Sequence, residues 1–310
     1  MRLFYKAAVV ILVLSTVISV SSCNASRQQG EQTCLAGFFL GDNPSWHELN
    51  AFREDFGKKP SLIMVFAEWG SYVPDKTVRD VYSAGARLMV TWEPWRAAAQ
   101  EAIDYDGLIA GKYDNYILDF ALRLKNIRRD LYLRFAHEMN GDWYPWSAAR
   151  IGSEKYIAIY RHIRKLFDNA GVDNVKWVFS INWEDRPKEN GFARSYPGDA
   201  YVDYCGIDGY NWGNSQNWSR WMSFQEIFSA RYSEITTSYE KPVIITEFGC
   251  SSKGGDKAEW IRQALLDIKA MQKVKAFVLF NVDKETDWAF DPESPAGKAL
   301  KGALEDPYFR

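Results

Sequence analysis

Eight short apolar runs, rich in β-branched and aromatic residues, alternate along the chain with longer segments of helical periodicity. The predicted strands cover residues 35–40, 61–66, 87–91, 131–136, 175–181, 201–207, 243–246 and 274–280. The predicted helices cover about 45–56, 74–84, 112–128, 153–169, 223–238, 256–271 and 296–304, with a poorly defined short helix after the fifth strand. This order is typical of an α/β chain folded as a single (β/α)8 TIM barrel. An open doubly wound sheet is the alternative, but no GxGxxG motif or phosphate loop favours it.

The first 22 residues have the pattern of a signal peptide. Arg2 and Lys6 precede an apolar run, residues 7–20, that is short for a membrane span, and small residues follow it. A retained signal anchor is the alternative. The sequence Val-Ser-Ser-Cys at 20–23 resembles a bacterial lipoprotein box, which implies cleavage before Cys23 and lipidation of that cysteine. We therefore expect a polar tether at 23–33, a folded domain at 34–310, and a cell-envelope protein held at the outer surface or in the periplasm by its lipid alone.

The charge and the remaining cysteines and histidines exclude several classes of protein. Without residues 1–22 the chain has 36 basic and 40 acidic residues, a net charge near −4, which does not suit a nucleic-acid binder. The other cysteines lack a CxxC motif and the histidines lack HxxxH spacing, so we expect no metal and no cofactor. One disulfide with a free thiol and three buried thiols are both compatible with the spacing. These residues are Cys34, Cys205, Cys250, His47, His137 and His162.

The segment 131–146, LYLRFAHEMNGDWYPW, places polar side chains directly after a predicted buried strand. His137, Glu138 and Asn140 lie where the strand opens into a loop, and aromatic residues follow them. A carboxyl group desolvated by aromatic faces has a pKa above its usual value of about 4.3, so Glu138 is a candidate proton donor at neutral pH. The alternative is a salt-bridged loop glutamate beside aromatics that only pack.

A second segment, KPVIITEFG at 241–249, repeats this design with Glu247 at the end of an apolar run. Two strands that each present a glutamate at their C-terminal ends supply what glycoside hydrolysis needs. One carboxyl protonates the leaving oxygen, and the other attacks or activates water.

Tryptophans gather at the same strand ends. In a barrel these ends form the active-site mouth, where indole faces cover the apolar faces of sugar rings. Any single tryptophan is explained by packing, but the whole set predicts a polysaccharide groove, with Trp92, Glu93 and Trp183 among the candidate contacts. The eight tryptophans are Trp69, Trp92, Trp95, Trp143, Trp146, Trp183, Trp212 and Trp288.

These residues resemble glycoside hydrolase family 26, whose members are retaining (β/α)8 enzymes. The resemblance rests on RFAHEMNGDW at 134–143, DGY at 208–210 and ITEFG at 245–249, and extends over the chain after the signal segment. It implies that Glu138 is the acid/base and Glu247 the nucleophile. It also implies that His137, Trp143, Tyr210 and Trp288 line the subsite of the sugar under attack, and we add Asn140 to these substrate contacts.

The resemblance favours a retaining endo-β-glycanase acting on a polysaccharide, with β-1,4-mannan first and mixed-linkage β-1,3-1,4-glucan second, and we expect the protein to be a monomer. Mannanases of the family often carry a histidine after the third strand and a WFWW-like run after the acid/base, whereas this chain has WEPW at 92–95 and WYPW at 143–146. A non-catalytic surface glycan-binding lipoprotein is an alternative of another class, and a structural envelope lipoprotein is a third. The presence of both glutamates favours the enzyme.

Overall fold

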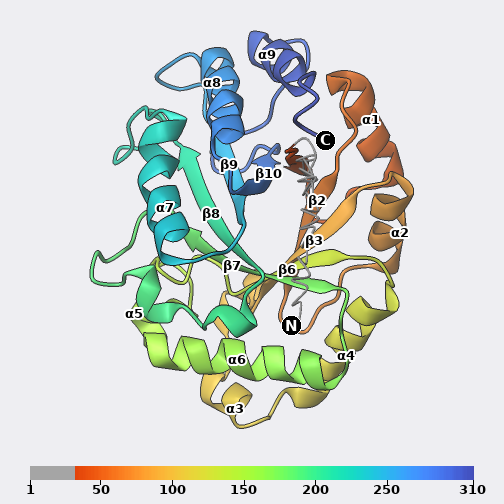
Figure 1. Cartoon of the computed structure of the whole chain (residues 1–310), viewed down its shortest axis with the longest axis vertical. Helices are drawn as coiled ribbons and strands as arrows, with labels where there is room; N and C mark the ends of the chain where they lie inside the picture. Colours follow the sequence, from red (N-terminus) through yellow and green to blue (C-terminus); the bar gives the residue numbers. More distant parts are fainter. Residues whose placement is uncertain (1–31) are drawn as a thin grey trace, which may run out of the picture. The chain divides into compact units, whose positions relative to one another are not determined.

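A computed structural model describes residues 32–310, so the expected signal segment 1–22, the lipidation site Cys23 and the tether up to residue 31 lie outside the described part. Within it, eight parallel strands close into one barrel, and Figure 1 shows helices around the outside of these strands. The spatial order is β1-β10-β9-β8-β7-β6-β3-β2. The strands are β1 (Leu35–Phe39), β2 (Leu62–Glu68), β3 (Arg87–Glu93), β6 (Leu131–Phe135), β7 (Val175–Asn182), β8 (Tyr204–Asn211), β9 (Val243–Cys250) and β10 (Val274–Phe280). The predicted (β/α)8 barrel is confirmed.

Most helices begin where the sequence supplies an N-cap. Ser45 and Ser223 form capping boxes with Glu48 and Glu226, and Asp256 caps the helix that follows it. The main helices are α1 (Trp46–Phe56), α2 (Asp75–Ser83), α4 (Asp114–Asn126), α6 (Ser153–Asn169), α7 (Phe224–Ser238), α8 (Lys257–Ala270) and α9 (Pro295–Leu304). The connection after β7 contains the short 3-10 helices η2 (Phe192–Ser195) and η3 (Asp199–Tyr201).

Several small elements lie in loops near the barrel mouth. The segment expected as a loop after the third strand contains an antiparallel hairpin of β4 (Trp95–Arg96) and β5 (Glu101–Ala102), with η1 (Ala97–Ala99) between them. Helices α3 (Tyr105–Ile109) and α5 (Ala148–Ile151) follow β5 and β6. Elements of two to five residues are too short to show a periodicity, so the sequence did not predict them.

The alternation of side chains along each strand divides the core into two clusters. Met64, Met89, Tyr132 and Val278 belong to the cluster inside the barrel. The neighbouring residues pack in the larger cluster between the strands and the helices. Polar residues at interior positions near the C-terminal strand ends therefore point into the mouth of the barrel.

Cys34, Cys205 and Cys250 are buried, and within residues 32–310 they are free thiols. Burial raises the pKa of each thiol to about 12, so they are protonated and unreactive at neutral pH. The sequence was compatible with one disulfide and a free thiol or with three buried thiols, and the structure has the three buried thiols. None of the helices in the described part has the length and apolar character needed to cross a membrane.

Candidate active site

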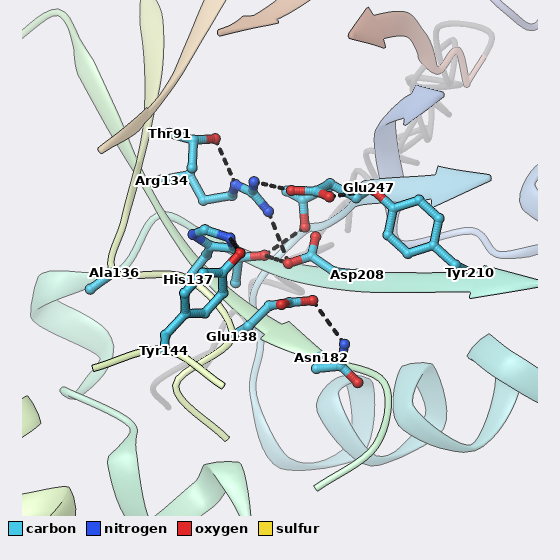
Figure 2. Close-up of polar contacts among 12 residues, drawn as sticks. Thr91, Arg134, Ala136, His137, Glu138, Tyr144, Asn182, Asp208, Tyr210 and Glu247 are labelled. Atoms are coloured by element: carbon cyan, nitrogen blue, oxygen red, sulfur yellow. Dashed lines mark hydrogen bonds and ion pairs between the residues drawn. The ribbon is translucent and has the colours of Figure 1, made fainter. Parts of the chain in front are cut away.

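Arg134 lies at the centre of the candidate site. It follows Tyr132 on the inner face of β6 and is fully buried. Its Nε donates to Thr91 Oγ1 at 2.9 Å, its Nη1 contacts Asp208 Oδ2 at 2.9 Å, and its Nη2 pairs with Glu247 Oε1 (Figure 2). Burial alone would lower the pKa of Arg134, but the two carboxylates raise it above its ordinary value. Arg134 is therefore a permanent cation that fixes side chains from three strands.

Glu247 reaches the interior because β9 contains an irregularity. Ile207 of β8 is in register with Ile245, whereas the next residue, Asp208, is in register with Glu247, so Thr246 is the extra residue. Such bulges re-aim side chains near active sites. Thr246 Oγ1 lies 2.7 Å from Ser180 Oγ inside the barrel, and Glu247 points into the mouth.

Two donors hold the Glu247 carboxylate. Arg134 donates to Oε1 and the Tyr210 hydroxyl donates to Oε2, and Figure 2 shows these side chains on opposite sides of Glu247. Burial and the negative charge of Glu247 raise the pKa of Tyr210 well above 10, so the phenol keeps its proton. A guanidinium and a phenol that donate to one carboxylate stabilise its anionic form.

Glu138 occupies a turn directly after β6. Ala136 and Glu138 have φ angles of 48° and 52°, in the left-handed region, and the Glu138 amide donates to the Ser180 carbonyl at 2.9 Å. Backbone conformations of this kind often occur at functional sites. The turn directs the carboxyl group to Asn182 Nδ2 at 2.8 Å and Trp143 Nε1 at 2.9 Å.

Glu138 and Glu247 have different electrostatic environments. Burial first, then the negative charges of Asp208 and Glu247, raises the pKa of Glu138 to about 8. Burial also raises the pKa of Asp208 to about 7, although Arg134 opposes this shift. Glu138 is thus protonated at neutral pH, while Glu247 is paired with a cation.

Glu93 is a third carboxyl group at the mouth. It follows Met89 and Thr91 on the inner face of β3, is 7% exposed, and accepts a hydrogen bond from Trp95 Nε1 at 3.0 Å. Burial raises its pKa to about 7. The strand alternation that brings Glu93 to the mouth supports its selection as a candidate substrate contact.

His137 is buried beside aromatic rings. Burial, followed by the charge of Arg134, lowers its pKa well below 6.5, so the ring is neutral. Its Nε2 lies 3.1 Å from the Tyr144 hydroxyl, and its Nδ1 has no hydrogen-bond partner within the described residues. Because His137 is only 1% exposed, its predicted contact with substrate stays a prediction.

The expected rim of eight tryptophans is only partly formed. Trp143 is 40% exposed beside Glu138, and the Trp288 ring lies 4.8 Å from Tyr210, although Trp288 is 1% exposed. Trp69 and Trp146 are buried, whereas Trp95 and Trp212 are half-buried.

Two predicted substrate contacts are corrected by the structure. Trp92 follows Val90 on the outer face of β3 and stacks on Phe120 of α4 at 4.1 Å, so it faces the helices. Trp183 is half-buried and packs partly against the same outer cluster, and its role as a substrate contact stays a prediction.

Asn140 is the second correction. It is fully buried, and its side chain bonds the Asn182 backbone N–H and carbonyl at 2.8 and 2.9 Å. Asn140 thus holds the segment that carries Asn182 against the Glu138 turn, and it has no exposed atom with which to contact a substrate.

Sequence reasoning did not select Arg134, Asp208, Asn182 or Ser180 as site residues. For Arg134 a signal was available in the sequence, because a charged residue inside an apolar strand is buried only where it has partners. Arg134 is also two positions from Tyr132, so both side chains point to the same face of the strand. The described residues contain no cluster of three or more His, Cys, Asp or Glu side chains arranged to bind a metal ion.

Two glutamates in unlike environments at the C-terminal mouth of a (β/α)8 barrel define a class of protein, the barrel glycoside hydrolases. The chain belongs to one family of that class, glycosyl hydrolase family 26, whose sequence profile matches residues 81–281. The family resemblance seen in the sequence is therefore confirmed.

Two curated relatives and one solved structure illustrate the similarity. The chain is 38% identical over 303 residues to Endoglucanase H of Acetivibrio thermocellus, covering 94% of this chain and 33% of that protein. It is 30% identical over 211 residues to a mannan endo-1,4-beta-mannosidase of Bifidobacterium adolescentis, covering 66% of this chain and 19% of that protein. The chain thus spans a third or less of the length of these relatives. A GH26 beta-mannanase from Bacteroides ovatus has the same fold, with a TM-score of 0.68, 17% identity and 90% of each chain covered.

Proposed function

We propose that this chain is a retaining endo-β-glycanase that hydrolyses a β-linked polysaccharide. One observation carries the proposal: a buried Glu138, whose burial raises its pKa to about 8, and a Glu247 carboxylate paired with Arg134 occupy the same barrel mouth. These are the unlike states that the acid and the nucleophile of a double displacement require.

In the first step the Glu247 carboxylate attacks the anomeric carbon while Glu138 gives its proton to the leaving oxygen, so the glycosidic bond breaks as the glycosyl-enzyme ester forms. Glu247 then has no charge, and the pKa of Glu138 falls. Glu138 next takes a proton from water, the hydroxide oxygen bonds to the anomeric carbon, and Glu247 is released. Retention by this route needs carboxyl groups about 5–5.5 Å apart, against roughly 6.5–9.5 Å for inversion.

β-1,4-Mannan is the first candidate substrate, because relatives from Bacillus subtilis and Bifidobacterium adolescentis are named mannan endo-1,4-beta-mannosidases. A β-glucan, in particular mixed-linkage β-1,3-1,4-glucan, is the second. It is favoured by the match over 94% of the chain to a protein named Endoglucanase H and by the WEPW segment after β3. A release assay on mannan, mixed-linkage glucan, xylan and β-1,3-glucan separates these substrates. Release from none of the four would favour a non-catalytic glycan-binding protein.

The roles of the two glutamates are tested with substrates that have good leaving groups. Glu138→Ala should still form the glycosyl-enzyme and should be rescued by azide with a β-azide product. Glu247→Ala should be inactive on the same substrates, with azide giving at most an α-azide product. The reverse pattern would exchange the two roles, and an α-configured first product from the wild type would reject retention.

We further propose that the chain is anchored to the cell envelope by a lipid on Cys23. The support is the short apolar run followed by small residues and a polar segment. Cys23→Ala should move the protein from the membrane fraction to the soluble fraction. A variant that is processed yet still fractionates with membranes would refute the anchor.

A further inference from the structure

A row of aromatic rings leads from Glu247 to the surface. Tyr210, whose hydroxyl donates to Glu247, lies 4.8 Å from Trp288, measured between ring centroids. Trp288 lies 4.8 Å from Trp212, and Trp212 lies 5.4 Å from Trp218. Exposure rises along the row from a buried Trp288 through a half-buried Trp212 to Trp218, which is 64% exposed.

The loop that carries Trp218 is held by hydrogen bonds. The buried Asn211 side chain accepts from the backbone N–H groups of Gly213 at 3.2 Å and Met222 at 2.9 Å, which closes the loop at its base. Ser219 Oγ donates to the Gly213 carbonyl at 2.6 Å. Trp218 is therefore an exposed aromatic side chain on an ordered loop.

The inner part of the row is also built for close packing. A Cβ atom at Gly249 of β9 would lie 3.0 Å from the Tyr210 ring and 3.2 Å from the Trp288 ring, so glycine lets both rings approach the strand. On the outer side, the Lys257 ammonium donates to the carbonyls of Asp287 at 2.6 Å and Ala289 at 2.8 Å, which fixes the loop of Trp288.

A single exposed tryptophan on a protein surface needs no special explanation. Trp218 differs because it ends a continuous row that begins at the proposed nucleophile. Indole faces cover the apolar C–H faces of pyranose rings. The exposed outer part of the row, Trp212 and Trp218, is therefore suited to contact sugars of a chain that enters the mouth.

The two ends of the site are distinguished by the two glutamates. Trp143 donates to Glu138, the proposed proton donor, and so lies on the side of the leaving group. The row starts instead at Glu247, which bonds to the sugar that is retained on the enzyme. We use this contact with Glu247 to assign the row to the glycon side of the cleaved bond.

We propose that Trp212 and Trp218 form glycon subsites beyond the reacting sugar, with Trp218 contacting the sugar farthest from the cleaved bond. This inference rests on the proposed function and specifies how long a chain the site recognises. Sugars bound there contribute binding that is equal in the ground state and the transition state, so their loss should raise KM more than it lowers kcat.

The test uses aryl β-glycosides of the sugar that the wild type hydrolyses, with two, three or four sugars on the glycon side. The aryl group fills the leaving-group side, so each added sugar extends only into glycon subsites. Trp218→Ala should match the wild type on the aryl disaccharide and lose about tenfold in kcat/KM on the aryl tetrasaccharide. Trp218→Phe should retain most of the gain from added sugars, and Leu266→Ala, which removes another exposed apolar side chain, should match the wild type throughout.

A loss of equal size on all three substrates, or no loss on the tetrasaccharide, would overturn the proposal. Binding of mannan and mixed-linkage glucan oligosaccharides to Glu138→Ala, with and without Trp218→Ala, is measured by calorimetry as a readout that needs no turnover. An inactive wild type whose Glu138→Ala form binds long oligosaccharides through Trp218 would refute the proposed activity and keep the binding site. Binding that does not depend on Trp218 would refute the site.

Discussion

At the scale of residues, the protonation state of Glu138 depends on the balance between its burial and the hydrogen bonds that its carboxyl group accepts. Asn182 Nδ2 donates to Glu138 Oε1 at 2.8 Å, and this hydrogen bond lowers a pKa that burial has raised to about 8. The wild-type kcat/KM on substrates with poor leaving groups should therefore fall as the pH rises through about 8, because the acid loses its proton.

Asn182→Ala removes a donor to the anionic form, so the pKa of Glu138 should rise and the alkaline limb of the kcat/KM profile should move to higher pH. The measurement is a pH profile on an unactivated oligosaccharide. Asn50→Ala on α1, a helix on the outside of the barrel, should leave the limb unchanged. A limb that stays in place or moves to lower pH in Asn182→Ala would contradict the assignment of Glu138 as the acid.

A second prediction at this scale concerns Arg134, whose single positive charge is paired with two carboxylates, those of Asp208 and Glu247. Removing one partner of a buried ion pair costs about 3–5 kcal/mol, since the remaining charge has no compensation. Arg134→Met should lower the free energy of unfolding in urea at neutral pH by about that amount. Adding Asp208→Asn should recover part of the loss by removing one uncompensated carboxylate, whereas strictly additive losses would contradict a shared charge.

How much of the site the sequence predicts depends on side-chain direction. Glu138 and Glu247 were found because each follows an apolar run, and Glu93 because it ends a strand. Trp92 ends the same strand, yet the alternation of side chains turns it towards the helices. The inward position of Glu247 depends on the bulge at Thr246, and no local residue pattern specifies that bulge.

At the scale of elements, the loop between β10 and α9 is fixed to the start of α8. Lys257, 7% exposed, donates to the carbonyls of Asp287, Trp288 and Ala289 at 2.6, 3.1 and 2.8 Å. Asp287 in turn accepts from Ser251 Oγ at 2.6 Å, directly after β9. The loops that follow β9 and β10 therefore form one hydrogen-bonded unit around Trp288.

Lys257→Met should break this unit and leave three backbone carbonyls without their donor. Each buried polar group left without a partner costs about 1–3 kcal/mol, and water that enters the site replaces part of the lost hydrogen bonding. We therefore expect the free energy of unfolding to fall by about 2 kcal/mol and KM to rise. Lys269→Met on the same helix, where the lysine side chain is 46% exposed, should change the unfolding free energy by less than about 0.5 kcal/mol. Equal losses from the two variants would show that the buried contacts of Lys257 contribute nothing specific.

The long helices and strands were predicted well because the hydrophobic periodicity and the capping residues indicated the same bounds. The helix from Ser153 to Asn169 has the predicted bounds, and β10 coincides with the eighth predicted strand. Strands β8 and β9 extend four residues past their predicted ends, to Asn211 and Cys250. These extensions carry polar and glycine residues of the mouth, which a criterion of apolar runs excludes.

At the scale of the described molecule, the barrel separates a catalytic end from a stabilising end. The C-terminal segment pairs with the start of β1: Cys34 N donates to the Tyr308 carbonyl at 2.8 Å, and Arg310 N donates to the Cys34 carbonyl at 2.8 Å. Phe309 is 2% exposed, and its ring lies 5.6 Å from Phe277 of β10. These contacts cover the N-terminal end of the strands, opposite the mouth that holds Glu138 and Glu247.

Phe309→Ala tests this separation. Truncating a buried phenylalanine removes its transfer free energy and leaves a cavity, so the free energy of unfolding should fall by about 3–5 kcal/mol. In a (β/α)8 barrel the active site is built from the opposite face, so kcat/KM per folded molecule, measured well below the unfolding transition, should match the wild type. Leu266→Ala, at a side chain 59% exposed on α8, controls for the loss of apolar surface and should change neither quantity. If kcat/KM fell together with the free energy of unfolding, packing at the base of the barrel would instead determine the geometry of the mouth. The interior side chains between β10 and β9 would then carry this effect.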